Sequence, residues 1–275
     1  MYSREQGLRE FLDSVPEYVT TAYVADNGPD QDRAVYRESW PFELETIHLE
    51  HDVGIGACRR ALVDSSDEPY LWMGDCDMRF VREGDLRVLR NVLDAHGGLG
   101  GAAGWLVEGD IIRSGARNLE VVGDSIIKTA GDPDIEHGPV PFARFEFVPQ
   151  ACLFRRDVFE TYTYDPAMGS SEHVDFFYGQ ALADEWDFAS VPAVTVHHQK
   201  NIDSDYRETK RGDNHLNSSR LEQKWGLEGT APGARSDWGQ VYDRSIPEQA
   251  FEVFKRATPP GVWLPVKRGL EAVVR

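Results

Sequence analysis

Cysteine and lysine are both scarce in this sequence, and each scarcity narrows the kinds of protein that it can encode. The 275 residues include only three cysteines, Cys58, Cys76 and Cys152, which lie far apart and form no CxxC pair. This spacing predicts free thiols in a reducing compartment and excludes a disulfide framework or a cysteine-rich zinc site. Only six of the 29 basic residues are lysine.

Basic residues are outnumbered by acidic ones. Asp and Glu total 47 against 29 Lys and Arg, which gives a net charge of −18. A surface rich in carboxylates and poor in lysine suits a cytoplasm of very high salt, because screening removes the self-repulsion of the chain. We therefore expect a salt-loving host, with an ordinary acidic enzyme as the alternative. The same balance disfavours nucleic-acid binding, whose affinity comes from Lys and Arg on phosphates.

Long apolar segments are also absent. No stretch approaches 18 uncharged apolar residues, and the first residues, MYSREQGLREF, contain no apolar signal-peptide core. We expect neither a transmembrane helix nor a secretion leader, and hence a cytoplasmic location. A hydrophobic content of 41% with 28% charged residues is typical of a globular protein.

Helical and strand patterns alternate over the first 108 residues. Leu8, Phe11, Leu12 and Val15 recur at helical spacing before Pro16. Strands are expected in YVTTAYVADN, ETIHLEHD, PYLWMGDCD and LGGAAGWL, and helices in VGIGACRRALVDS and REGDLRVLRNVLDAH. This order predicts an α/β fold with a mostly parallel sheet covered on both faces.

The second half has a weaker pattern. It loosens from 109 to 144, where GDPDIEHGPVP predicts a loop. A strand and a short helix are expected in FEFVPQACLFRRDVFE, a longer helix from about Glu172, and a last strand that ends at His197 and His198.

Acidic side chains follow several of the expected strands. Asp75 and Asp77 come after YLWM, and Asp26, His51 and Asp52 also fall at strand ends, where α/β sheets bind ligands. Asp75 and Asp77 lie where the chain turns, so both can converge on one Mg²⁺ or Mn²⁺, which leaves positions for substrate phosphates. The alternative is that they solvate a loop in a very acidic protein.

Two later motifs add candidate groups. EHVDFFYG places Glu172, His173 and Asp175 at a helix start, where one of them could act as a general base. The alternative is that these acids interact with the helix dipole. In VTVHHQ, His197 and His198 point to opposite sides of a strand, so at most one joins a metal. A structural histidine is the alternative.

In this order, the motifs resemble those of family 2 type glycosyltransferases of the GT-A fold, over about residues 3 to 226. AYVADNG resembles the strand that places Asp26, with Asn27, on the donor nucleotide. VGIGACRRAL resembles the family's G-x-G-x-x-R-N turn and helix, with Arg59 at the arginine and Arg60 at the usual asparagine. YLWMGDCDMRF occupies the Asp-x-Asp (DXD) site, whose first acid, Asp75, also meets the donor.

The resemblance also assigns the remaining site. SEHVDFF lies where inverting members carry Glu-Asp-x-Asp, and VPAVTVHH lies where they carry a distal metal-binding histidine, for which His198 fits better than His197. The implied catalytic candidates are Glu172, His173 and Asp175, and the implied metal ligands are Asp75, Asp77 and His198.

The resemblance implies a nucleotide-diphospho-sugar transferase fold, a Rossmann-like mixed sheet flanked by helices. The implied organisation is a domain at 1–226, divided into a nucleotide-binding part at 1–108 and an acceptor-side part at 109–226, with a C-terminal extension at 227–275. The implied enzyme is a hexosyltransferase, inverting, which uses Mn²⁺ or Mg²⁺ with a nucleotide-diphosphate sugar, most commonly a UDP-sugar. Its acceptor would be a glycan or a lipid-linked molecule, in surface glycan, glycolipid or glycoprotein synthesis.

Two departures from the family pattern keep alternatives open. His173 stands at the position of the usual catalytic acid, so the proton could pass to Glu172, His173 or Asp175. The family's first nucleotide-binding strand is missing ahead of MYSRE. A non-catalytic nucleotide- or sugar-binding relative is therefore one alternative. A sugar-phosphate nucleotidyltransferase is another, although no glycine-rich phosphate loop is present.

The C-terminal extension predicts a further contact. Residues 247–275 carry five basic and three acidic side chains together with Phe251, Phe254, Val262, Trp263 and Leu264. This composition predicts a segment that lies at the inner face of the cell membrane. The alternative is a helix that packs on the domain.

Overall fold

The main sheet of the protein is mixed, and its register positions the candidate site. The computed structural model describes residues 5–109, 111–129, 133–169, 171–199, 214–227, 229–232, 254–255 and 257–266. The eight strands of this sheet are β3 (Tyr70–Met73), β4 (Met78–Phe80), β5 (Leu99–Glu108), β6 (Ile111–Arg113), β9 (Asp134–Glu136), β10 (Phe142–Phe145), β11 (Cys152–Arg155) and β12 (Asp187–His198). Their order is β3-β11-β5-β12-β10-β9, with β4 paired to β12 and β6 to β5.

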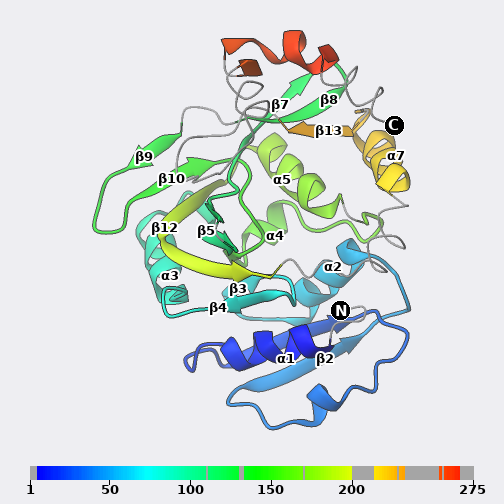
Figure 1. Ribbon diagram of the computed structural model, residues 1–275, viewed down its shortest axis with the longest axis vertical. Coiled ribbons are helices and arrows are strands. Elements are labelled where there is room, and N and C mark those ends of the chain that lie inside the picture. Colours follow the sequence, from blue (N-terminus) through cyan, green and yellow to red (C-terminus); the bar gives the residue numbers. More distant parts are fainter. Residues whose placement is uncertain are drawn as a thin grey trace.

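Helices cover both faces of this sheet (Figure 1). α3 (Leu86–Ala95) covers one face, and α4 (Val158–Thr161) and α5 (Glu172–Ala183) cover the other. The other helices are α1 (Glu5–Ser14), α2 (Ile55–Ser65) and α7 (Asn214–Trp225), with a 3₁₀ turn η1 (Ala34–Arg37). On β11, Leu153 packs in the cluster with α3, whereas Cys152 and Phe154 pack with α4 and α5. Successive strand residues point to opposite faces, so a continuous apolar run fills two cores.

Two smaller sheets lie at opposite ends of the main one (Figure 1). The first pairs β1 (Thr21–Asp26) with β2 (Glu43–His48) in parallel. Leu8 and Leu12 of α1 cover it by packing on Val24 and Phe42. The second joins β7 (Asn118–Val122), β8 (Ser125–Thr129) and β13 (Gly229–Pro232).

The expected order of helices and strands over the first 108 residues is confirmed, but the expected mostly parallel sheet is wrong. Of the strand pairings among the described residues, only β1 with β2, β5 with β12 and β8 with β13 are parallel. The reason is β11, which comes from much later in the chain and inserts antiparallel between β3 and β5.

The expected loop between 131 and 141 is also partly wrong, because β9 lies within it and pairs with β10. Strands β6 to β9 are short and partly exposed, so they carry no clear alternation of apolar residues. The loosened pattern from 109 to 144 therefore contains strands that the sequence did not predict.

Part of the predicted C-terminal extension joins the fold. β13 pairs with β8, and Trp263 and Leu264 are buried against Ile127 of β8. These contacts favour the alternative of a segment that packs on the domain, although Val262 is 53% exposed. Residues 233–253 and 267–275 of the extension lie outside the described residues. Within the described part of the chain, no helix is both long and apolar enough to cross a membrane.

Candidate active site

Sheet register brings His198 between two carboxylates. Strand β12 lies between β4 and β5, with His198 opposite Met78 in one pairing and His197 opposite Val107 in the other. Residue 198 therefore lies next to both Asp77, which precedes β4, and Glu108, which ends β5.

The side chains complete this arrangement. His198 Nδ1 donates to Glu108 Oε1 at 2.7 Å, and His198 Nε2 lies 3.6 Å from Asp77 Oδ1. Because Glu108 binds one ring nitrogen, it fixes the orientation of the ring and directs the other nitrogen toward Asp77. A carboxylate behind a histidine in this way is the usual support of a metal-binding histidine. The neighbouring His197 is exposed.

Arg59 links the other half of the site. Its Nη2 donates to Asp75 Oδ1 at 2.9 Å, its Nε to Glu172 Oε1 at 3.1 Å, and its Nη1 to Gln150 Oε1 at 3.1 Å. Arg59 is only 3% exposed, whereas the Asp75 side chain is 39% exposed. The structure therefore uses the Arg59 guanidinium to hold Asp75 and Glu172 in place.

Glycine explains how α2 delivers Arg59. The Gly56 amide, near the start of α2, donates to Met168 O at 3.0 Å. A Cβ at Gly56 would lie 2.3 Å from that oxygen and 2.5 Å from Asp165 O. Only glycine permits this approach of the helix to the loop before α5, and the approach brings Arg59 to Glu172.

Glu172 is buried, and its burial has an electrostatic consequence. Burial raises the pKa of the carboxyl, and the charge of Asp75 acts in the same direction, while Arg59 opposes both. The pKa remains above its ordinary value. A carboxylate with a raised pKa holds a proton more readily, which suits a general base.

His173 belongs to the core next to this site. Its Nε2 lies 2.8 Å from Val148 O, and its ring centroid is 4.4 Å from that of Phe147. A carbonyl only accepts, so Nε2 carries the proton and donates. Burial lowers the pKa of His173 well below its ordinary value. The described contacts thus make His173 a neutral, packed ring.

The Asp175 side chain points away from Arg59 and toward α7. It is fully buried and accepts from Trp225 Nε1 at 2.7 Å, Tyr162 Oη at 3.0 Å and Lys224 Nζ at 3.0 Å. Trp225 and Lys224 belong to α7, so Asp175 fastens α7 to α5. Of the three acidic or basic candidates at the start of α5, Glu172 alone contacts Arg59 and, through it, Asp75.

Asp26 shapes the loop that follows β1. Its carboxylate is fully buried and accepts from Arg33 Nη2 at 3.1 Å, Tyr36 Oη at 2.6 Å and the Gly28 amide at 2.9 Å. Burial acts to raise its pKa, but the hydrogen bonds from Arg33 and Tyr36 outweigh burial and lower it. Asn27 is 8% exposed, and its carbonyl accepts from the Asp52 amide.

Three contributors to the site were not singled out from the sequence. Glu108 follows the expected strand LGGAAGWL by two residues, and its position near a carboxyl end was an available signal. Gln150 lies in the expected acceptor-side part at 109–226 but carries no charge. Arg33 lies in a loop seven residues after Asp26, where nothing in the sequence indicates a buried pair.

The donor atoms at Asp77 and His198 fit a divalent metal in part. Among the described residues, no three His, Cys, Asp or Glu side chains lie close enough to hold an ion by themselves. Mg²⁺ and Mn²⁺ commonly use one or two protein ligands and take the rest from water and substrate phosphates. The pair of Asp77 and His198, oriented by Glu108, meets that requirement, while Asp75 is bound to Arg59.

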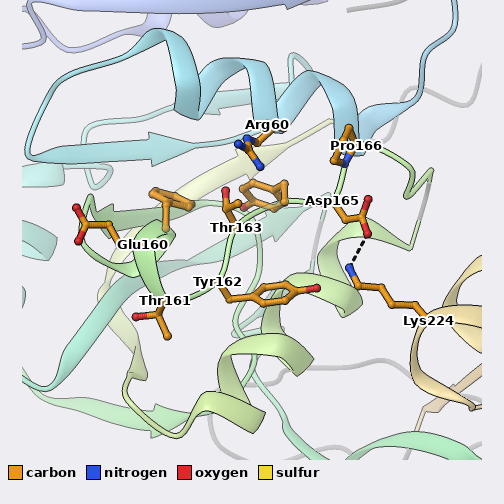
Figure 2. Close-up of a pocket in the computed structure, with 10 residues that line it drawn as sticks. Arg60, Glu160, Thr161, Tyr162, Thr163, Asp165, Pro166 and Lys224 are labelled. Atoms are coloured by element: carbon orange, nitrogen blue, oxygen red, sulfur yellow. Dashed lines mark hydrogen bonds and ion pairs between the residues drawn. The ribbon is translucent and has the colours of Figure 1, made fainter.

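A pocket of about 360 Å³ lies beside α2, between this helix and the segment 159–166 (Figure 2). Arg60 of α2 and Tyr162 line it, and Lys224 closes one end by its ion pair with Asp165 at 2.6 Å. Asp75, Asp77 and His198 do not line this pocket, so it is separate from the candidate site.

Solved structures provide the comparison. With the crystal structure of S. aureus TarS 1–349 the TM-score is 0.51 at 14% identity, over 81% of this chain and 63% of that one. With TarS 1–349 in complex with UDP, the TM-score is 0.51 at 12% identity, over 82% of this chain and 70% of the TarS chain. With GalNAc-T7 bound to UDP, GalNAc and Mn²⁺, the TM-score is 0.53 at 13% identity, over 70% of this chain and 39% of the GalNAc-T7 chain.

Sequence comparison adds no relative: no family model matches the chain, and no curated protein matches it. The chain spans less than two thirds of the TarS 1–349 structure and of GalNAc-T7. TM-scores of 0.51 to 0.53 indicate a shared fold, and at identities of 12 to 14% the likeness is limited to the fold. The expected fold class is thus confirmed: the chain adopts the mixed α/β fold of the GT-A glycosyltransferases.

Proposed function

We propose that the protein is a glycosyltransferase that moves a sugar from a nucleotide-diphosphate donor to an acceptor hydroxyl and uses Mn²⁺ or Mg²⁺. The observation that carries the proposal is the arrangement at the ends of β3, β5 and β12. There, Glu108 directs His198 toward Asp77, while Arg59 joins neighbouring Asp75 to the buried Glu172. This arrangement lies on a fold shared with structures that contain UDP.

Charge is the reason for a metal in this proposal. A chain of net charge −18 repels a nucleotide diphosphate. Asp77 and His198 would hold the divalent ion, with Asp75 beside them. When bound, such an ion neutralises the charge that builds on the leaving diphosphate. A UDP-sugar is the donor that we propose, and the presence of UDP in the similar structures of TarS 1–349 and GalNAc-T7 supports that choice.

Glu172 is the proposed base. Its carboxylate takes the proton of the acceptor hydroxyl while the acceptor oxygen bonds to the anomeric carbon and the bond from that carbon to the diphosphate oxygen breaks. Attack from the face opposite the leaving group inverts the anomeric centre. Arg59 positions Glu172 relative to Asp75, and His173 and Asp175 support α5 from outside the reaction.

The nucleoside would lie on the loop after β1. We propose that Asp26 shapes this loop through Arg33 and Tyr36, so that Asn27 and the loop backbone meet the base or ribose. The acceptor would be a glycan or a lipid-linked molecule reached from the 109–226 side, in surface glycan or glycolipid synthesis. The proposed location is the cytoplasm of a salt-loving host. Trp263 and Leu264 pack on the domain, so only the exposed side of the C-terminal extension, which includes Val262, would meet the inner membrane face.

Calorimetry in molar KCl tests the proposal. UDP should bind the full chain with MnCl₂ present and at least about tenfold more weakly with EDTA. Asp77→Ala should abolish the manganese dependence. Arg90→Gln is a suitable control, because it removes one exposed charge far from Asp77 and should change nothing. Absence of any manganese-dependent UDP binding by the wild type contradicts the proposal.

A non-catalytic nucleotide-binding protein is the second candidate. The observation in its favour is that Asp75, a proposed metal ligand, is already bound by Arg59. Hydrolysis of UDP-sugars with Mn²⁺ separates the two candidates. Turnover that disappears in Glu172→Gln while UDP binding persists supports the enzyme, whereas binding without turnover of any UDP-sugar supports the second candidate.

A further inference from the structure

Lys128 on β8 is a cation that has no carboxylate partner within the described residues. Its Nζ lies 4.6 Å from the centroid of the Phe147 ring, and the side chain is partly buried. The chain has 47 acidic residues and only six lysines. Lys224, by contrast, contacts both Asp165 and Asp175. A lysine kept apart from so many carboxylates requires an explanation.

The surroundings of Lys128 make its charge costly. Burial lowers the pKa of Lys128 to about 8, and the charge of Arg117 acts in the same direction. Glu172 acts in the opposite direction without forming an ion pair with it. At neutral pH the ammonium is still the main form. A partly buried cation without a counter-ion is unfavourable unless a ligand supplies the negative charge.

Other donors without partners adjoin the same segment of the chain. The amide nitrogen of Gln150, three residues after Phe147, is buried without a hydrogen-bond partner, and so is the hydroxyl of Ser114. Gly115, next to Ser114, lies against Pro149, since a Cβ on it would be 3.3 Å from the Pro149 ring. Buried donors that lack acceptors among the described residues, on the segments around Phe147, favour an anionic partner.

The position of this group relative to Glu172 indicates which substrate would supply the anion. The Phe147 ring contacts both Lys128 and His173. His173 is adjacent in sequence to the proposed base. Lys128 and Phe147 both belong to the acceptor-side part, whereas Asp75 and Asp77 belong to the first 108 residues.

We propose that Lys128 binds an anionic group, a phosphate or a carboxylate, that the acceptor carries near the hydroxyl that receives the sugar. This inference rests on the proposed glycosyltransferase function and narrows its acceptor to an anionic molecule. An anionic acceptor meets repulsion from Glu172 and from the net charge of the chain, and Lys128 offsets that repulsion. The diphosphate of the donor is the other group that could supply a negative charge to Lys128.

Calorimetry with glucose 6-phosphate and glucose, at constant ionic strength, tests the assignment on the full chain with saturating UDP and Mn²⁺. Glucose 6-phosphate should bind at least about tenfold more tightly than glucose. Lys128→Gln should remove that preference, and Lys128→Arg should keep it within about threefold. Arg90→Gln, which removes an exposed charge elsewhere, should leave it unchanged. Thermal unfolding of each variant checks that it folds.

Three results would overturn the proposal. The first is an equal preference in wild type and Lys128→Gln. The second is loss of glucose 6-phosphate binding when UDP and Mn²⁺ are added, together with weaker UDP binding in Lys128→Gln, which assigns Lys128 to the donor diphosphate. The third is a preference for glucose 6-phosphate over glucose that depends on Lys128 although the protein binds no UDP. Lys128 would then belong to an anion site that has no role toward an acceptor.

Discussion

Asp175 provides the sharpest contrast between a structural and a catalytic role. The sequence made it a candidate for catalysis, whereas its carboxylate lies fully buried between three donors, Tyr162, Lys224 and Trp225. In Asp175→Asn the shape is kept and the charge is lost. The amide presents an N–H₂ group to donors, so at least one of these hydrogen bonds is replaced by a clash of two donors.

The cost follows from these contacts. Removing one partner of a buried ion pair costs about 3–5 kcal/mol. The Lys224 side chain is 27% exposed and keeps its ion pair with Asp165, so we expect the lower part of that range, with a fall of about 3–4 kcal/mol in the free energy of unfolding. For a chain of this size, this corresponds to a decrease of about 5–10 °C in Tm.

Urea and thermal unfolding at fixed KCl concentration measure the change. Asp64→Asn is the matched control, because Asp64 is 55% exposed and pairs only along its own helix with Arg60, and it should cost less than about 0.5 kcal/mol. Folded Asp175→Asn should keep most of its transferase turnover. A stable Asp175→Asn protein whose kcat falls a hundredfold would refute the structural interpretation.

Three further predictions address the metal, the helix start and the loop after β1. Glu108→Gln should weaken Mn²⁺ binding by about 10- to 100-fold, because the ring of His198 loses its carboxylate support; manganese titration calorimetry measures this, and an unchanged affinity speaks against the ligand pair. Gly56→Ala should lower the free energy of unfolding, measured with urea, by about 1–3 kcal/mol, because the added Cβ meets backbone oxygens. Gly97→Ala is the control and should change it little, because a Cβ at Gly97 has no atom within 4 Å. Asp26 has a lowered pKa, so its stabilisation is present above the unfolded-state pKa of about 3.9 and is lost as the pH falls through the lower native pKa. The difference in unfolding free energy between wild type and Asp26→Asn should therefore be constant from pH 5 to 7 and shrink below pH 4; a difference that grows below pH 4 has the wrong sign.

Local patterns were sufficient to predict the strand that precedes the proposed metal site. The apolar run YLWM followed by Asp-Cys-Asp predicted a buried strand with acids at its end, and β3 ends at Met73, directly before that turn. Strand alternation likewise predicted that His197 and His198 point to opposite sides, and β12 exposes His197 while it turns His198 toward Asp77. Both results depend only on residues next to one another in the chain.

Sheet order could not be predicted in the same way. The insertion of β11 between β3 and β5 depends on backbone hydrogen bonds between segments about 50 to 80 residues apart. The short strands β6 to β9 are defined by their partners and lack an apolar alternation of their own. Pairing of this kind is a property of the folded sheet and leaves little trace in a local pattern.

The sequence by itself determined the elements, the α/β class and the set of acids and histidines at strand ends, because hydrophobic period and turn chemistry act over a few residues. Only the tertiary structure decided what those groups do to one another. On α5, Glu172, His173 and Asp175 are successive or nearly successive, yet each step of about 100° around the helix sends them to Arg59, Phe147 and Lys224. Which of them faces the site depends on where α2 and α7 pack, and that packing is set by contacts across the whole chain.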